Sequence, residues 1–177
     1  MRKWSGILLV CIPFYLFATP IRIVSYNVEN LFDTTHDSLK NDYAYLPEGE
    51  HHWTYSRFAD KITHIAQVLV DIGQWNTIPL IGLVEVENDY CIQALLRQLH
   101  GKPYRSIHYE SPDERGVDVV LLYDSLRVQI AQSEALAVHL PNGDFTRDVL
   151  YARALVDKTT DLHVLVCHLP SALSKDG

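Results

Sequence analysis

The chain has 177 residues, of which 47% are hydrophobic and 21% charged, so it is long enough for one globular domain and is not intrinsically disordered. Its net charge of −7 argues against the broad basic surface that drives non-specific nucleic-acid binding. This charge does not exclude phosphate chemistry, because a bound divalent cation can outweigh an acidic background locally.

Residues 1–18 have the composition of a signal peptide. Arg2 and Lys3 give a positive start, and residues 7–17 form an apolar stretch that is too short to span a bilayer. A buried N-terminal strand or helix is the alternative. We therefore expect an exported protein, periplasmic or secreted, with no stable membrane anchor and a single domain over residues 19–177.

The first half of this domain is predicted to alternate between strands and helices. A strand over residues 21–27 leads into a long polar loop over residues 33–52. A helix then begins at Thr54 or Ser56, either of which can cap it, and Gly73 lies just past its end. The apolar residues that recur at helical spacing are Phe58, Ile62, Ile65, Leu69 and Ile72.

A continuous apolar run over residues 79–85 predicts a fully buried strand. Asn88 or Asp89 can cap a second helix, which Gly101 ends. Strands dominate the rest of the chain, and Pro-Asn-Gly-Asp at residues 141–144 is interpreted as a hairpin tip between two of them. The expected strands cover residues 104–109, 117–123, 127–138, 149–157 and 161–168.

Cysteine and histidine give little indication of a zinc site. Cys91 and Cys167 could form a disulfide in an oxidising compartment, but two free buried thiols, in a helix and an inner strand, fit better. The absence of a Cys-x-x-Cys pair from the sequence argues against a thiol-based metal or redox site. His51 and His52 are adjacent and point to opposite sides of an extended segment, so we expect solvent-facing loop residues.

Two polar turns follow strand-like apolar runs. Asn27 comes at the end of the first strand, and Glu85 at the end of the buried second one. An amide and a carboxylate at strand ends suit Mg²⁺, which takes one or two carboxylates and completes its shell with water and substrate phosphate. Asn27 could instead cap its turn, and Glu85 could face a helix dipole, although Glu87 and Asp89 are better placed for that role. Glu87 and Glu29 are interpreted as loop acids.

Four segments, taken in order, resemble the endonuclease/exonuclease/phosphatase family. They are Tyr26-Asn27, Leu83-Val84-Glu85, the stretch from Tyr109 to Tyr123, and the stretch from Val164 to Ser171 that contains His168. The resemblance implies an α+β fold, an α/β sandwich of two packed, mainly antiparallel β-sheets flanked by helices. The chain ends before the family's later G-D-x-N and D-H motifs, so we expect a domain truncated at its C-terminal end.

The resemblance also implies roles for individual residues. Asn27 and Glu85 would bind the metal, Mg²⁺ with Mn²⁺ or Ca²⁺ as alternatives. His168 would be catalytic, stabilising the pentavalent phosphate or passing a proton, and Glu110 would orient it. The alternative for His168 is a structural histidine at a strand end. Cys167 stands where the family usually has Asn beside this histidine.

Arg115 and Asp118 are expected to bind substrate. The planar guanidinium of Arg115 suits phosphate oxygens, and Asp118 interrupts an apolar strand near the same end of the sheet. An internal Arg–Asp ion pair that steadies the loop is the alternative.

These roles together imply an exported, Mg²⁺-dependent phosphoesterase, a nuclease or another phosphodiesterase, in which water attacks phosphorus. The substrate would be a nucleic acid, a phospholipid head group or a phosphorylated small molecule, and the protein would be a monomer. The alternative is a catalytically inactive remnant, or a binding domain on the same fold. The missing motifs lead us to expect little phosphodiesterase activity from these 177 residues alone.

Overall fold

A computed structural model describes residues 20–139 and 146–169 of the chain. The predicted signal peptide, the predicted hairpin tip at residues 141–144 and the end of the family-like stretch after Leu169 lie outside these residues.

The elements follow the predicted order, and their ends differ by a few residues. The two α-helices are α1 (Tyr55–Gly73) and α2 (Asp89–Gln98), and a short 3₁₀ helix, η1 (Tyr43–Tyr45), precedes them. The strands are β1 (Ile23–Leu31), β2 (Leu80–Val86), β3 (Tyr104–His108), β4 (Asp118–Asp124), β5 (Val128–Leu136), β6 (Val149–Val156) and β7 (Thr160–Val166).

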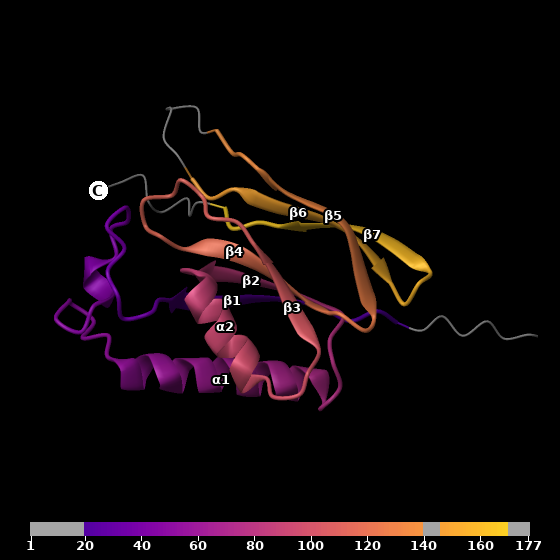
Figure 1. Cartoon of the computed structure of the whole chain (residues 1–177), viewed down its shortest axis with the longest axis horizontal. Coiled ribbons are helices and arrows are strands. Elements are labelled where there is room, and N and C mark those ends of the chain that lie inside the picture. Colours follow the sequence, from indigo (N-terminus) through magenta and orange to yellow (C-terminus); the bar gives the residue numbers. More distant parts are fainter. Residues whose placement is uncertain (1–19, 140–145, 170–177) are drawn as a thin grey trace, which may run out of the picture.

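The strands form two sheets packed face to face (Figure 1). One sheet has the order β1-β2-β4-β3, in which β1 and β2 are parallel and the other pairs antiparallel. The other sheet has the order β5-β6-β7 and is antiparallel throughout. Helices α1 and α2 cover the face of the first sheet that is turned away from the second. This arrangement confirms the predicted α+β sandwich.

Strand β2 lies at the centre of the molecule and contributes to cores on both of its faces. Ile81 and Leu83 pack with the helices, whereas Leu80 and Val84 pack against the second sheet. Successive side chains of a strand point to opposite faces, so a strand buried on both sides must be apolar throughout. Gly82 lets the second sheet approach, since a Cβ there would lie 3.2 Å from a methyl carbon of Val166.

The helix ends agree in part with the sequence prediction. The side chain of Asn88 accepts a hydrogen bond from the backbone N–H of Cys91, which confirms Asn88 as the cap of α2. The side chain of Thr54 makes no capping hydrogen bond in α1, and Gly73 is the last helical residue rather than the one beyond. The left-handed conformation after α1 is taken by Gln74, with φ 50°.

Aromatic side chains pack against one another in the loop between β1 and α1. The ring of Tyr45 stacks on that of Phe32 with 4.1 Å between centroids, and it also contacts the rings of His51 and Trp53. His51 and His52 are exposed, as expected from the sequence.

Both cysteines of the described domain are free, as predicted, but only Cys91 is buried. The expectation that Cys167 lies in an inner strand is wrong. It comes just after β7, which is an edge strand of its sheet, and its side chain is exposed.

None of the helices in residues 20–139 and 146–169 combines the length and the apolar character needed to cross a membrane.

The burial of the sheet on both faces predicts that two leucines contribute very differently to the free energy of unfolding. Leu122 of β4 is 0% exposed in the helix-side core, whereas Leu126 is 81% exposed. We expect Leu122→Ala to lower the free energy of unfolding by about 2–5 kcal/mol because it leaves a cavity. Leu126→Ala, the matched control, should change it by less than about 0.5 kcal/mol. Urea denaturation of both variants checks this, and equal losses would contradict the assigned packing.

Candidate functional site

Glu85 is the extra residue of a β-bulge near the end of β2. Its neighbours Val84 and Val86 are paired with Val119 and Asp118, two consecutive residues of β4, so Glu85 has no partner of its own in this ladder. Its backbone has φ +69°, a left-handed conformation that non-glycine residues rarely adopt. Bulges re-aim side chains. Because of the bulge, Val86 still points into the helix-side core, whereas Glu85 no longer follows the alternation of side chains between the two faces of the strand.

Hydrogen bonds from β1 fix the Glu85 carboxylate. Its Oε1 accepts from Nδ2 of Asn27 at 3.0 Å, and its Oε2 accepts from the backbone N–H of Asn30 at 2.9 Å. Oδ1 of Asn27 in turn accepts from the backbone N–H of Glu29 at 2.7 Å. Parallel pairing of β1 with β2 brings Asn27 and Glu85 to the same edge of the sheet. The predicted pair of oxygen-bearing side chains therefore lies together.

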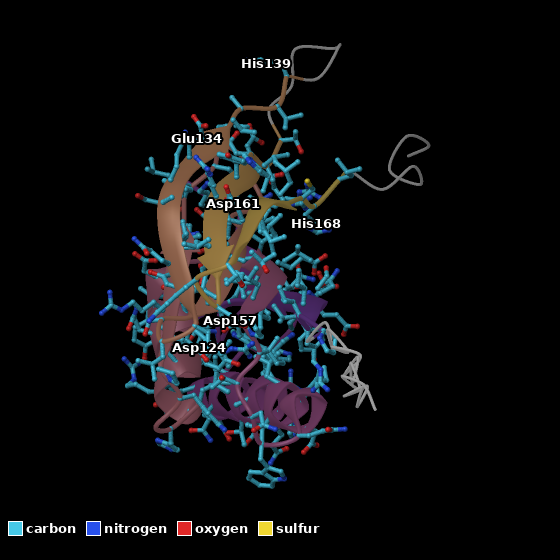
Figure 2. The ribbon with its side chains drawn as sticks, turned by 90° about the vertical axis from the view of Figure 1, so that its right-hand side faces the viewer. Asp124, Glu134, His139, Asp157, Asp161 and His168 are labelled. Carbon is cyan, nitrogen blue, oxygen red and sulfur yellow. The ribbon has the colours of Figure 1, made fainter. Side chains whose placement is uncertain are left out.

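His168 reaches this carboxylate from the second sheet. Figure 2 shows it at one end of β7, with Asp157, which precedes this strand, near the other. Nε2 of His168 lies 3.3 Å from Oε1 of Glu85, and its Nδ1 is buried without a hydrogen-bond partner among the described residues. Burial, reinforced by the nearby Arg147 charge, lowers the pKa of His168. The imidazole is therefore favoured in its neutral form, which can accept a proton.

Two arginines stand beside His168. Arg147 is only 5% exposed, and its Nη1 donates to the backbone carbonyl of His168 at 3.2 Å. Arg115 is more open, and its Nε and Nη2 bind the buried carboxylate of Asp113 at 3.0 and 2.7 Å. Nε of Arg147 lies 3.8 Å from the same carboxylate. Hydrogen bonding to Asp113 raises the pKa of Arg115, and burial lowers the pKa of Arg147; the charge of Glu85 acts upward on both pKa values. Positive charge therefore gathers near the Glu85 carboxylate.

Sequence reasoning missed Arg147 and Asp113. Arg147 lies just past the predicted hairpin tip, and it was not distinguished from an ordinary turn residue. The expected internal partner of Arg115 was Asp118, whereas the structure pairs Arg115 with Asp113, two residues away. A signal for Asp113 was present in Asp-x-Arg, because an Asp side chain can accept from a backbone N–H two residues later, as it does here at 2.9 Å.

Glu87 differs from Glu85 although only two residues separate them. It is 5% exposed, and its Oε2 accepts from the backbone N–H of Asp33. Burial raises the pKa of Glu87 to about 8, so its carboxyl group is mostly neutral at pH 7. Glu87 lies in the loop between β2 and α2, as the sequence predicted, but its side chain is buried against the start of the loop after β1. The Glu87 carboxyl group is enclosed and bonded to the backbone of Asp33, whereas the Glu85 side chain can be reached from solvent, so Glu85 is better placed to bind a metal.

Lys61 and Tyr45 complete the surroundings of Glu85. Nζ of Lys61, from α1, donates to the backbone carbonyl of Glu29, and burial lowers the pKa of this lysine while Glu29 and Glu85 raise it. Burial raises the pKa of Tyr45, and the charge of Glu85 adds to this shift. A cation from α1 and an aromatic ring from η1 therefore also lie near the carboxylate.

Glu110 and Asp118 lie together, next to His108. Among the described residues, the carboxylate that pairs with His168 is that of Glu85. Glu110 instead lies in a cluster with His108 and Asp118. Asp118 is 1% exposed, and its Oδ2 accepts from the backbone N–H of Ser111 at 3.3 Å. The catalytic role of Glu110 and the substrate-binding role of Asp118 stay predictions.

The donor set at Glu85 fits a hard divalent cation. A carboxylate has about four lone-pair positions, and Asn27 and Asn30 occupy two of those on Glu85. The side chain is 16% exposed, so the remaining positions can be reached from solvent. Few protein ligands, all of them oxygen, are typical of Mg²⁺ sites, which keep several waters.

A sequence profile of the endonuclease/exonuclease/phosphatase family matches residues 22–176. The chain therefore belongs to this family, whose members generally depend on divalent metals. No curated protein matches the sequence at a significant level.

Solved structures share the fold at low identity. TDP2 from D. rerio, complexed with a single-strand DNA product, is 20% identical with a TM-score of 0.52, covering 86% of this chain and 47% of that one. A family member from Bacteroides vulgatus is 14% identical with a TM-score of 0.55, covering 82% and 51%. ANGEL2, described as a 2′,3′-cyclic phosphatase, is 14% identical with a TM-score of 0.54, covering 81% and 39%. The chain thus spans half or less of the length of most of these structures, and the likeness establishes the fold alone.

The Asp113 carboxylate predicts a pH-dependent contribution to stability. Burial alone would raise its pKa, but hydrogen bonds from Arg115 and the charge of Arg147 lower it below 3.8. Because the folded-state pKa is depressed, the stabilisation is present above pH 3.8 and is lost as the pH falls through the folded pKa. We expect Asp113→Asn to cost about 1–3 kcal/mol at pH 7, and progressively less as the pH falls through the folded-state pKa.

Chemical denaturation of wild type and Asp113→Asn between pH 2.5 and 7 measures this difference. Asp157→Asn is the control, because its exposed pair with Arg127 is screened by solvent and should matter less. A loss that does not change with pH would show that Asp113 acts through packing rather than charge.

Proposed function

We propose that the protein is an exported, Mg²⁺-dependent phosphoesterase. The proposal rests on one observation, the convergence of Asn27, Glu85 and His168 at one edge of the sandwich, with Arg115 and Arg147 beside them. Oxygen donors for a cation, a neutral imidazole and guanidinium groups are the set of parts that phosphoester hydrolysis requires.

Glu85 and Asn27 are the residues that would hold the cation. Mg²⁺ bound there supplies positive charge to the phosphoryl oxygens and lowers the pKa of a coordinated water. The rest of the chemistry belongs to the chain. The hydrogen bond from Asn30 and the bulge hold the Glu85 carboxylate in place before substrate arrives, so little reorganisation is needed at the moment of reaction.

His168 is placed to handle a proton. Its neutral form can accept one at Nε2 from a water that attacks phosphorus, or, once protonated, can stabilise the negative charge that develops there. Its backbone carbonyl is held by buried Arg147, which fixes the start of the segment after β7. Arg115 uses one edge of its guanidinium on Asp113, and Nη1 is the nitrogen left to bind a phosphate oxygen.

We propose that the substrate is a phosphoester with an accessible leaving group, either in a single-stranded nucleic acid or in a small molecule. One neighbour, TDP2, binds a single-strand DNA product, and another, ANGEL2, is a 2′,3′-cyclic phosphatase; single-stranded DNA and a cyclic phosphate both contain phosphodiester linkages. The net charge of −7 disfavours duplex nucleic acid, whose binding depends on many basic contacts. Export, which rests on residues 1–18, and a monomeric state are part of the same proposal.

The test compares two isosteric substitutions in the full-length product of the gene. We expect Glu85→Gln to lower kcat/KM on bis-p-nitrophenyl phosphate on the order of 100-fold and to weaken the dependence on Mg²⁺, because the ligand charge is lost. Glu87→Gln is the matched control, since Glu87 is already mostly neutral at pH 7. Its Mg²⁺ curve should resemble that of the wild type, and thermal melts check that both variants fold.

Two results would count against the proposal. If Glu85→Gln keeps the wild-type Mg²⁺ curve while Glu87→Gln loses it, the ligand has been assigned to the wrong carboxylate. If the full-length wild-type protein binds Mg²⁺ but hydrolyses neither the model diester nor single-stranded oligonucleotides, the alternative of a binding domain on the same fold replaces the enzyme.

A further inference from the structure

A second cluster of possible metal ligands lies where β3 ends and β4 begins. His108 is the last residue of β3, Asp118 is the first of β4, and Glu110 lies in the loop between them. One ligand atom from each residue lies within 4.8 Å of the other two. Because β3 and β4 are antiparallel neighbours, the turn between them brings the three side chains together.

The imidazole of His108 is oriented by a carboxylate, as metal-binding histidines commonly are. Its Nδ1 lies 3.1 Å from Oδ1 of Asp89, in the first turn of α2. Metal-binding histidines commonly donate one ring N–H to a carboxylate, which fixes the tautomer and leaves the other nitrogen free for the ion. The side chain of Asp89 is 81% exposed, so this contact does not serve the core.

The other ring nitrogen of His108 is buried and faces the Asp118 carboxylate without a hydrogen bond. The side chain is 6% exposed, and Nε2 makes no hydrogen bond to any of the described residues. Oδ2 of Asp118 is 3.8 Å away, which is too long for a hydrogen bond. Two ligands of one tetrahedral Zn²⁺ are separated by about 3.3 Å, given bonds of about 2.0–2.2 Å. The gap therefore needs only a small contraction to hold an ion.

We propose that His108, Glu110 and Asp118 form a second cation site, separate from Glu85, for a divalent transition ion such as Zn²⁺. One imidazole and two carboxylates suit Zn²⁺ better than Mg²⁺, which favours oxygen ligands alone. Three protein ligands leave a fourth position for water. A buried polar nitrogen without a partner is costly, and the ion satisfies it.

The consequence of this site is to anchor the loop between β3 and β4. The loop carries Asp113 and Arg115, and Nζ of Lys40 already binds its backbone at the carbonyls of Ser111 and Asp113, at 2.7 and 3.0 Å. An ion that joins both strand ends to this loop would restrict the position of Arg115. The site therefore links cation binding to the arginine that we propose for phosphate.

The test is Zn²⁺ titration of the protein carrying Glu85→Gln, which removes the proposed Mg²⁺ ligand from the background. We expect one equivalent to bind by calorimetry, and Co²⁺ to give a visible spectrum with a nitrogen ligand. His108→Asn should weaken binding by more than about 100-fold, and Asp89→Asn by about 10–100-fold, the range for a residue that orients a ligand. Bound Zn²⁺ should also slow hydrogen exchange in residues 109–117.

The controls separate this site from general histidine binding and from misfolding. His64→Asn removes an exposed histidine on α1 and should leave the affinity unchanged. Glu110 is exposed, so Glu110→Gln tests a ligand without disturbing the core. The proposal fails if no stoichiometric Zn²⁺ binding occurs, which would favour a bridging water. It also fails if Glu110→Gln and Asp118→Asn both bind as tightly as their parent. Neither failure bears on Glu85.

Discussion

The position of the Glu85 carboxylate is the constraint on which the rest of the site depends. A charged group at the end of a strand that is buried on both faces must find hydrogen bonds, a cation or solvent. The bulge and the left-handed backbone at Glu85 turn it out of the core, and Asn27 and Asn30 donate to it from the parallel neighbour β1. His168 can reach it because the second sheet packs closely where β2 has Gly82.

Burial shifts the pKa values of ionisable groups around this carboxylate. Glu85 keeps some exposure, whereas Glu87, two residues on, is enclosed, and its pKa rises to about 8. Burial therefore favours the neutral form of the Glu87 carboxyl group at pH 7. Arg147 and Arg115 share the carboxylate of Asp113, which keeps both guanidinium groups near His168 without neutralising them fully. The same edge can therefore accommodate a cation and an anion together.

The sequence was sufficient for the parts of this arrangement that depend on local pattern. Apolar runs predicted the buried strands, helical spacing predicted α1, and Asn88 is one of the two caps predicted for α2. Asn27 and Glu85 were expected at one site, and they lie together because β1 and β2 are parallel neighbours, although Asn27 lies inside β1 rather than at its end. Short motifs carried the resemblance to the family, and the resemblance in turn implied the α+β sandwich.

What the sequence did not reveal depends on contacts between distant residues. The burial of Glu87 requires the loop after β1 to fold over it, and the exposure of Cys167 follows from β7 lying at a sheet edge. Neither fact is encoded in the neighbouring residues. The position of Arg147 beside His168 likewise depends on the packing of β6 against β7. The cluster at His108 was not predicted, because His108, Glu110 and Asp118 come together only when β3 and β4 pair and the loop between them folds back.

The central claim is that the Glu85 carboxylate binds a divalent cation. The most direct measurement is an anomalous difference map from crystals of the protein soaked in Mn²⁺, which can replace Mg²⁺ at oxygen sites. The account predicts a peak about 2.0–2.4 Å from a carboxylate oxygen of Glu85, with the Asn27 side chain beside it. A peak at Glu87 instead, or no peak at either carboxylate when the ion is in excess, would contradict it.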